Sequence, residues 1–200
     1  MVSQLNVDKI YNEGGDNDSG VNLATNDTVK FDIAGSTKWT MNSSGNLFPS
    51  STSQGICFGV TSDTAANRLS DYEEGTWTGT IIGHTAAPSS SQTATGLYTK
   101  IGRLCTVSLY SGEKNTSGAS GDLRITGLPF TSHSSASDMG GYLSYNMANN
   151  AANTVNTACW VAGNVAYVSF YDNLDTGAWS TTQIYAGTTY IAFSVTYPVA

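Results

Sequence analysis

Short stretches in which apolar and polar residues alternate recur along this 200-residue chain, and runs rich in Gly, Ser and Asn separate them. In residues 189–197, every second residue is Ile, Phe, Val or Tyr. A period of two is typical of a β-strand with one buried face, because successive side chains of a strand point to opposite sides. The side chains predicted to face a core in this stretch are Ile191, Phe193, Val195 and Tyr197. The pattern therefore confines most of the chain to β structure.

The composition favours the same fold class. The chain holds 25 Ser, 26 Thr, 16 Asn and 21 Gly, which is 88 of 200 residues, whereas charged residues make up only 12%. A soluble domain usually has about 25% charged residues. Helix-forming Glu, Lys, Arg, Leu and Gln are scarce, while strand-forming Thr, Val, Tyr and Trp are plentiful. Because 40% of the residues are hydrophobic, a core can form. A helical bundle, a coiled coil and wholesale disorder are therefore excluded.

The charge balance excludes broad nucleic-acid binding, because that needs clustered Lys and Arg. Here 15 acidic side chains stand against 8 basic ones, for a net charge of −7. No run approaches the roughly 18 apolar residues of a membrane span, and residues 1–15 lack the apolar core of a secretory signal. We therefore expect that the protein does not insert into a membrane. We also expect that it is synthesised in a reducing cytoplasm. Cys57, Cys105 and Cys159 are expected to be buried hydrophobic side chains rather than disulfide partners.

Two regions are predicted, 1–66 and 67–200. The first region has short apolar segments separated by loop-forming runs, and strands are expected at 28–33 and 38–41. In 28–33, Val29, Phe31 and Ile33 alternate with polar residues, which predicts one half-buried face. So few apolar side chains cannot fill an ordinary core. This region is therefore expected to need partner chains, and identical copies are the simplest ones.

The second region has the strand signals of an antiparallel β-sandwich, jelly-roll-like in its many short strands. In 103–110 the inward side chains are expected to be Cys105, Val107 and Leu109. A tight turn is predicted at 162–165, with Gly163 supplying the positive φ. The expected strands are 76–82, 96–101, 103–110, 123–127, 140–147, 157–162, 164–171, 178–185 and 189–197.

The sequence contains no recognisable catalytic, metal or cofactor constellation. His84 and His133 lie beside Ser/Thr-rich loops, outside any context that would activate a nucleophile. Residues 16–20 resemble the opening of a calcium loop, but Val21 and Asp27 stand where an EF-hand has Gly and Glu. The remaining carboxylates are scattered, so no pair predicts glycoside hydrolysis. We expect a protein that is not an enzyme and holds no cofactor.

A sugar site is predicted in the segment 171–180. Saccharides bind an aromatic face together with Asp, Asn or Thr groups for their hydroxyls. This segment offers Asp172, Asn173, Asp175 and Trp179 as glycan contacts. The alternative is that Trp179 begins a strand and fills the core, while the acids only solvate a loop.

Several motifs resemble those of bacteriophage tail fibres and related virion appendages. Residues 31–47 are similar to a stem element with the pattern F-x-x-x-G-S followed by N-S-S-G-N. Residues 69–78, L-S-D-Y-E-E-G-T-W-T, are similar to the opening of a β-rich virion module. Residues 98–102, Y-T-K-I-G, and 125–130, I-T-G-L-P-F, follow in the order of that module. One departure is Gly79, where the family usually has Pro.

The resemblance implies a homotrimeric virion protein. The region 1–66 would anchor it to other virion proteins and form a stem, and 67–200 would form the head. The head would contact a glycan or protein of the host surface. The alternatives are an architectural capsid-decoration, head-fibre or tail-tip subunit without a receptor role, and a polysaccharide depolymerase, which the missing catalytic constellation disfavours.

Overall fold

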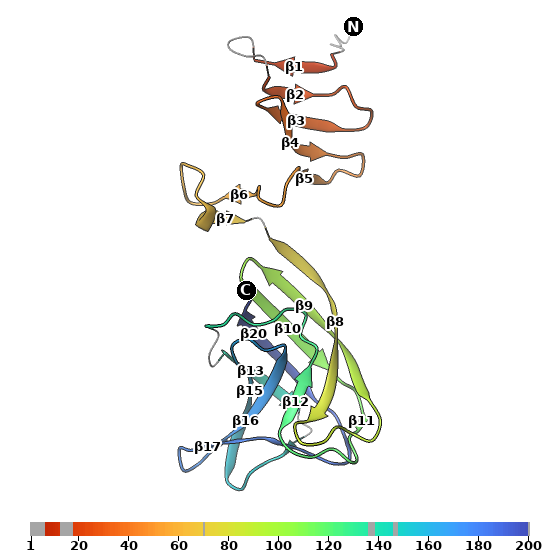
Figure 1. Ribbon diagram of the computed structural model, residues 1–200, viewed down its shortest axis with the longest axis vertical. Coiled ribbons are helices and arrows are strands. Elements are labelled where there is room, and N and C mark those ends of the chain that lie inside the picture. Colours follow the sequence, from red (N-terminus) through yellow and green to blue (C-terminus); the bar gives the residue numbers. More distant parts are fainter. Residues whose placement is uncertain (1–6, 13–17, 70, 136–138, 146–147, 200) are drawn as a thin grey trace. The chain divides into compact units, whose positions relative to one another are not determined.

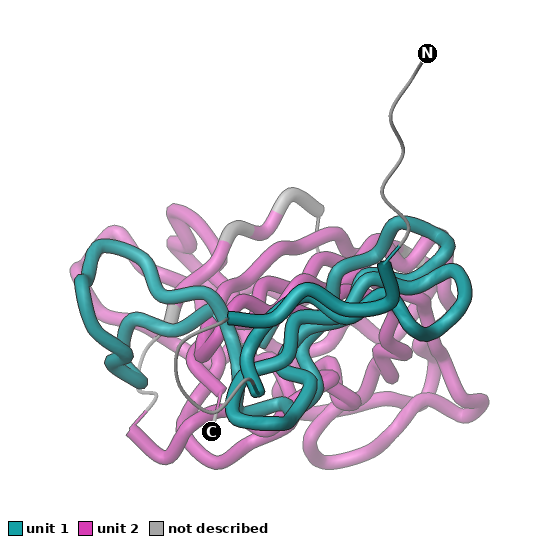
Figure 2. The backbone as a smooth tube through the Cα atoms, turned by 90° about the horizontal axis from the view of Figure 1, so that it is seen from above, with its two compact units in different colours: residues 1–71 teal, residues 72–200 magenta. Residues whose placement is uncertain are grey.

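The computed structural model describes residues 7–12, 18–69, 71–135, 139–145 and 148–199. About 55% of the chain is strand and 2% is helix, so the protein is all-β with antiparallel sheets, as predicted. It divides into two compact units, Met1–Asp71 and Tyr72–Ala200 (Figure 2). The predicted division after residue 66 falls earlier, because β6 (Ile56–Cys57) pairs with β7 (Arg68–Leu69) and keeps that segment in the first unit. A short 3₁₀ turn, η1 (Ala65–Asn67), precedes β7.

The first unit is built on one five-stranded antiparallel sheet in which every strand pairs with its neighbour in sequence (Figure 1). Because each strand pairs with the next one along the chain, the sheet is a simple meander. The strands are β1 (Lys9–Tyr11), β2 (Gly20–Asn22), β3 (Val29–Ile33), β4 (Ser36–Met41) and β5 (Leu47–Pro49).

One face of this sheet is largely apolar, and we call its apolar side chains the stem face. Directly opposite residues on paired strands point to the same side, and one such row runs Ile10, Val21, Phe31, Trp39, Pro49. A second row runs Val29, Met41, Leu47. With Ile33, which lies two residues after Phe31, these nine side chains make up the stem face.

The expectation of a half-buried stripe in 28–33 was wrong for the single chain. Phe31 and Ile33 are 39% and 55% exposed, whereas Asp32 on the opposite face is buried. No described apolar side chain of the first unit is buried. The physical reason is that a sheet face needs a second layer to cover it, and the described part of this unit contains none.

The second unit is an antiparallel barrel of eight strands. The pairings run β12-β8-β9-β10-β20-β13-β15-β16, and β16 also pairs with β12, which closes the ring. β17 (Trp179–Thr181) pairs with the end of β16 beyond that closure. The ring strands are β8 (Tyr72–Gly83), β9 (Gln92–Ile101), β10 (Leu104–Tyr110), β12 (Leu123–Thr126), β13 (Met139–Tyr145), β15 (Thr154–Val161), β16 (Tyr167–Leu174) and β20 (Ala192–Pro198).

Two short antiparallel strand pairs lie in the loops that connect the ring strands. β11 (Lys114–Asn115) pairs with β19 (Thr188–Thr189), and β14 (Ala148–Asn149) pairs with β18 (Gln183–Ile184). All nine predicted strands of the head have a counterpart, although the end of the expected strand 140–147 lies outside the described residues. No helix in the described part of the chain has the length and apolarity to cross a membrane.

The interior of the barrel is filled as the alternation predicted. Cys105, Val107 and Leu109 on β10 are at most 4% exposed. Along β20 and just before it, the four inward side chains predicted from the sequence are also buried: Ile191, Phe193, Val195 and Tyr197. The second unit therefore has a core of its own.

The turn between β15 and β16 differs in detail from the prediction. Asn164, and not Gly163, adopts the positive φ, at 58°. Asn is the residue besides Gly that enters the left-handed region most readily. A turn at this place was correctly predicted, but the residue with the positive φ was not.

Candidate functional site

Three aromatic rings gather on the outer surface of the barrel, on β15, β16 and β17. We call Trp160, Tyr171 and Trp179 the aromatic platform. The ring centroids of Trp160 and Tyr171 are 4.5 Å apart, and those of Tyr171 and Trp179 are 4.9 Å apart with planes at 71°. Trp179 is 63% exposed. The hypothesis that it fills the core is therefore wrong.

Strand alternation explains why these rings point outward. On β16, Val168 and Phe170 enter the core, so Tyr171 between Phe170 and the buried Asp172 must face out. On β15, buried Cys159 and Val161 leave Trp160 on the outside. The pairing registers then place the three strands side by side.

Two amide side chains border the platform. Asn173 lies opposite both Asn156 on β15 and Trp179 on β17. Its Nδ2 donates to Oδ1 of Asn156 at 2.6 Å, and both side chains are exposed. The remaining amide groups can donate to or accept from a ligand hydroxyl. Aromatic rings beside free amides form a surface on which the apolar face of a neutral sugar can rest.

Asp172 does not belong to this site, which corrects the sequence-based assignment. It is fully buried, on the inward side of β16. Its Oδ1 accepts from Asn150 Nδ2 (2.8 Å), Thr157 Oγ1 (2.7 Å) and Thr182 Oγ1 (2.8 Å), and its Oδ2 accepts from the Ala151 N–H (2.8 Å). The carboxylate is thus a structural acceptor that no ligand reaches.

Of the other predicted contacts, Asn173 and Trp179 lie opposite each other on β16 and β17. Asp175 lies in the turn that connects these two strands. Asp175 is exposed, and its N–H donates to the Asn153 carbonyl at 3.0 Å. Trp160, Tyr171 and Asn156 also belong to this surface, although no local sequence motif pointed to them. Alternation around Phe170 could have found Tyr171, whereas the two residues on β15 depend on the register between strands.

The segments with the motifs D-Y-E-E, Y-T-K-I-G and I-T-G-L-P-F meet at one end of the barrel. Tyr98 donates a hydrogen bond to Glu73, and its ring lies 5.6 Å edge-on from Phe130. The Lys100 ammonium lies 5.4 Å from the centroid of the same Phe130 ring. Tyr197 OH donates to the Phe130 carbonyl at 3.1 Å. The hydrogen bond to the Glu73 carboxylate is the main reason that the pKa of Tyr98 is raised. These contacts tie strands together, and their chemistry is structural.

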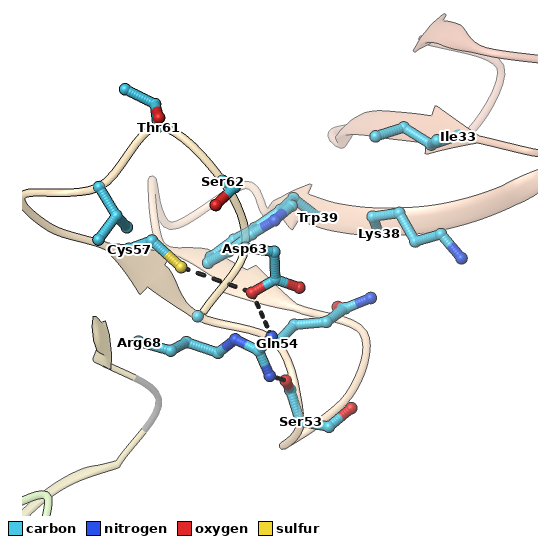
Figure 3. Close-up of a pocket in the computed structure, with 12 residues that line it drawn as sticks. Ile33, Lys38, Trp39, Ser53, Gln54, Cys57, Thr61, Ser62, Asp63 and Arg68 are labelled. Carbon is cyan, nitrogen blue, oxygen red and sulfur yellow. Dashed lines mark hydrogen bonds and ion pairs between the residues drawn. The ribbon is translucent and has the colours of Figure 1, made fainter. Parts of the chain in front are cut away.

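An open hollow of about 690 Å³ lies within the first unit (Figure 3). Arg68 forms an ion pair with Asp63 and donates to the Ser53 carbonyl, and the Cys57 thiol donates to the same Asp63 carboxylate at 3.6 Å. The hydrogen bond from Arg68 holds the pKa of Asp63 below its usual value. The acid of the hollow is therefore already paired with a cation. The lining residues are Ile33, Lys38, Trp39, Ser53, Gln54, Gly55, Cys57, Val60, Thr61, Ser62, Asp63 and Arg68.

The described residues contain no group of three or more His, Cys, Asp or Glu side chains that could hold a metal. Residues 13–17, at the start of the calcium-like segment, lie outside the described part. The expectation of burial was wrong for Cys57, which is only partly buried, because the described part of the first unit has no buried apolar side chain. Cys105 and Cys159 are buried free thiols, as predicted, and burial raises the pKa of Cys159 to about 12. Such a thiol is a packing group and a poor nucleophile.

Comparison with known families finds no family model that matches the chain, and comparison with curated proteins finds no match either.

Proposed function

We propose that this protein is a subunit of a bacteriophage virion appendage of the tail-fibre kind. Copies of the first unit associate with one another as a homotrimer, and the second unit contacts a glycan or protein of the host surface. Other virion proteins hold the N-terminal region. The contrast between the two units carries this proposal: the first exposes one apolar face of its sheet, and the second is a closed barrel with its own core.

The stem face has the character of an assembly surface. Five of its nine side chains (Ile10, Phe31, Ile33, Met41 and Leu47) are between 39% and 55% exposed. They form one contiguous apolar patch, and such patches on a protein surface often mark interaction sites. The face carries no acidic side chain, so two chains of net charge −7 can meet there without opposing carboxylates. One basic side chain, Lys38, lies at its edge and lines the same hollow as Ile33 and Trp39.

The other side of the same sheet carries the polar side chains, which are hydrogen-bonded to one another, together with the exposed rings of Tyr11 and Phe48. Asp32 accepts from Thr37 Oγ1 at 2.7 Å and from Asn22 Nδ2 at 2.9 Å, and Lys30 donates to Thr25 Oγ1 at 2.9 Å. Hydrogen-bonded polar groups gain little from a partner chain. The sheet therefore favours one orientation, with the stem face against copies of itself.

The aromatic platform supports the adhesive role of the head. Aromatic side chains supply large contact area at low entropic cost. A single shallow site of this kind binds weakly. Three copies on one appendage, and several appendages on one particle, would raise the effective affinity by avidity.

Light scattering on the full chain tests the assembly. Three copies of the 21.0 kDa chain give a mass of about 63 kDa. Ile33→Glu, on the stem face, should shift the mass toward that of one chain. The matched control Thr40→Glu places the same charge on the opposite face and should leave the mass unchanged. A wild-type chain that stays monomeric at micromolar concentration contradicts the proposal.

A glycan array and binding to whole host cells test the adhesive role. Trp179→Ala should abolish binding, whereas Val155→Ala, at an exposed β15 side chain that is not part of the aromatic platform, should leave it intact. If the wild-type protein enters particles but binds neither glycans nor cells, the second candidate holds. That candidate is a purely architectural subunit, and the internal satisfaction of Asp172 and of the motif contacts favours it.

A further inference from the structure

We propose that the outward face of β9, β10 and β20 is a second contact surface between copies of this chain, through which the heads associate. This inference rests on the proposed assembly of identical chains and adds the head to it. We call this surface the neutral face. Its side chains are Thr93, Thr95, Leu97, Thr99, Ile101, Leu104, Thr106, Ser108, Tyr110, Ala192, Ser194, Thr196 and Pro198.

The neutral face carries no formal charge on any of its three strands, which lie side by side in the order β9, β10, β20. Its exposed side chains include Leu97 at 63%, Tyr110 at 62%, and Ile101 and Leu104 at 53% each. A monomeric surface usually interrupts such a stretch with Lys or Glu, because charge protects against association. The neutral face therefore combines exposed apolar side chains with the absence of charges that would oppose contact with another copy.

A hollow of about 410 Å³ lies on this face, toward the end where β10 finishes and β20 begins. Ser108 and Ser194 are small side chains directly opposite each other on β10 and β20, and Leu97 is the partner of Ser108 on β9. Ala192, opposite Tyr110, is small as well. The small residues form the floor, and Leu97 and Tyr110 rise beside it.

Two aromatic rings lie at the rim of the hollow. Tyr110 packs against Tyr190 with ring centroids 6.3 Å apart and planes at 67°, so the pair projects as one aromatic body. An apolar hollow next to an apolar projection allows the projection of one copy to enter the hollow of the next. A contact of this head-to-tail kind closes into a ring when the rotation between copies is right.

The charge distribution identifies a second copy as the occupant. The chain carries 15 acidic and 8 basic side chains, so two copies repel wherever charged surfaces approach. A basic partner would instead be expected on an acidic surface. The neutral face lets identical acidic chains approach closely, as the stem face does.

Sedimentation of the full chain gives the first test. Leu97→Glu buries an unpaired charge in the contact and should weaken assembly at least tenfold, since such charges cost several kcal/mol at an interface. The matched control is Val155→Glu, at an aliphatic side chain on β15 that is 68% exposed. It should change the association constant by less than about threefold. Equal effects of the two substitutions would refute the inference.

Distances between spin labels give the second test, and they separate this inference from the proposed function. In a Cys57→Ser background, which keeps only the buried Cys105 and Cys159, single labels are placed at Thr93→Cys or Val155→Cys. The ring order places β9 across the barrel from β15. Labels at position 93 should therefore lie closer together than labels at 155. A chain that assembles without this difference keeps the proposed function and overturns the neutral face, whereas a chain that never assembles overturns both.

Discussion

Asp172 illustrates how one residue can be misjudged from its neighbours in sequence. It lies between Tyr171 and Asn173, both of which face outward, yet its own carboxylate binds groups from three segments inside the barrel. Burying a carboxylate is costly unless donors surround it. Four donors do so here. Asp172 therefore orders the end of the barrel on which the aromatic platform stands.

Replacing Asp172 by Ala should destabilise the head by about 3 kcal/mol, because four donors lose their acceptor in a buried place. Urea unfolding, followed by tryptophan fluorescence, measures the change. Asp175→Ala is the control, since the exposed Asp175 side chain should contribute within about 0.5 kcal/mol. Similar stabilities for the two variants would show that the carboxylate of Asp172 is not the structural acceptor described.

Asp32 predicts a pH dependence in the stem. Hydrogen bonds from Thr37 and then Asn22 hold the pKa of Asp32 below its ordinary value of 3.8. The folded carboxyl is thus more acidic than the unfolded one, so its stabilising effect is present above pH 3.8 and is lost as the pH falls through the folded pKa.

Thermal unfolding of the full chain and of Asp32→Asn checks this expectation. The wild type should unfold at the higher temperature near neutral pH, and the two melting temperatures should converge in acid. A difference that stays constant down to pH 2 would argue against the role of the carboxylate.

At the scale of elements, the pairing of β8 with β9 depends on Gly96, which leaves room for the indole ring of Trp77 on the opposite strand. Trp77 lies directly opposite Gly96, and Trp77 is 5% exposed. A Cβ added at Gly96 would clash with the indole nitrogen of Trp77 and with the backbone oxygen of Ser108. The absence of a side chain at Gly96 therefore allows the indole to lie flat within the core.

Gly96→Ala should cost about 1–3 kcal/mol, the usual range for overpacking a core. Gly140 on β13 provides the matched control, because the nearest atom to an added Cβ there is the Cys159 carbonyl oxygen at 4.0 Å. Gly140→Ala should be neutral or slightly stabilising. Chemical denaturation of both variants distinguishes a steric effect from a general loss of glycine flexibility.

At the scale of the whole molecule, assembly has to overcome repulsion between acidic chains. Each copy carries −7, and neither proposed contact face carries an acidic side chain. Salt screens repulsion between exposed charges and leaves apolar contacts in place.

Association should therefore strengthen as NaCl rises from about 0.02 M to about 0.5 M, where the screening length has fallen severalfold. Sedimentation at a series of salt concentrations measures the association constant. An assembly held together by ion pairs would weaken over the same range, which is the opposite sign.

Local patterns were enough to predict much of this fold. Alternation located the strands of the barrel and assigned Cys105, Val107 and Leu109 to its interior. The same reasoning failed at Asp32 and Phe31, where the apolar side of β3 is the exposed one. Alternation tells which side chains share a face, and it carries no information on whether another layer covers that face.

The sequence by itself determined that the chain is β-rich, that its first region lacks a core, and which side chains of each strand point the same way. These are properties of neighbouring residues. Only the tertiary structure decided that the strands close into a ring, through the pairing of β12 with β16, and that Trp160 meets Tyr171. Both depend on registers between strands, one of them past a bulge between Thr154 and Asn156. Register between strands is set by packing across the whole barrel, so a local pattern does not contain it.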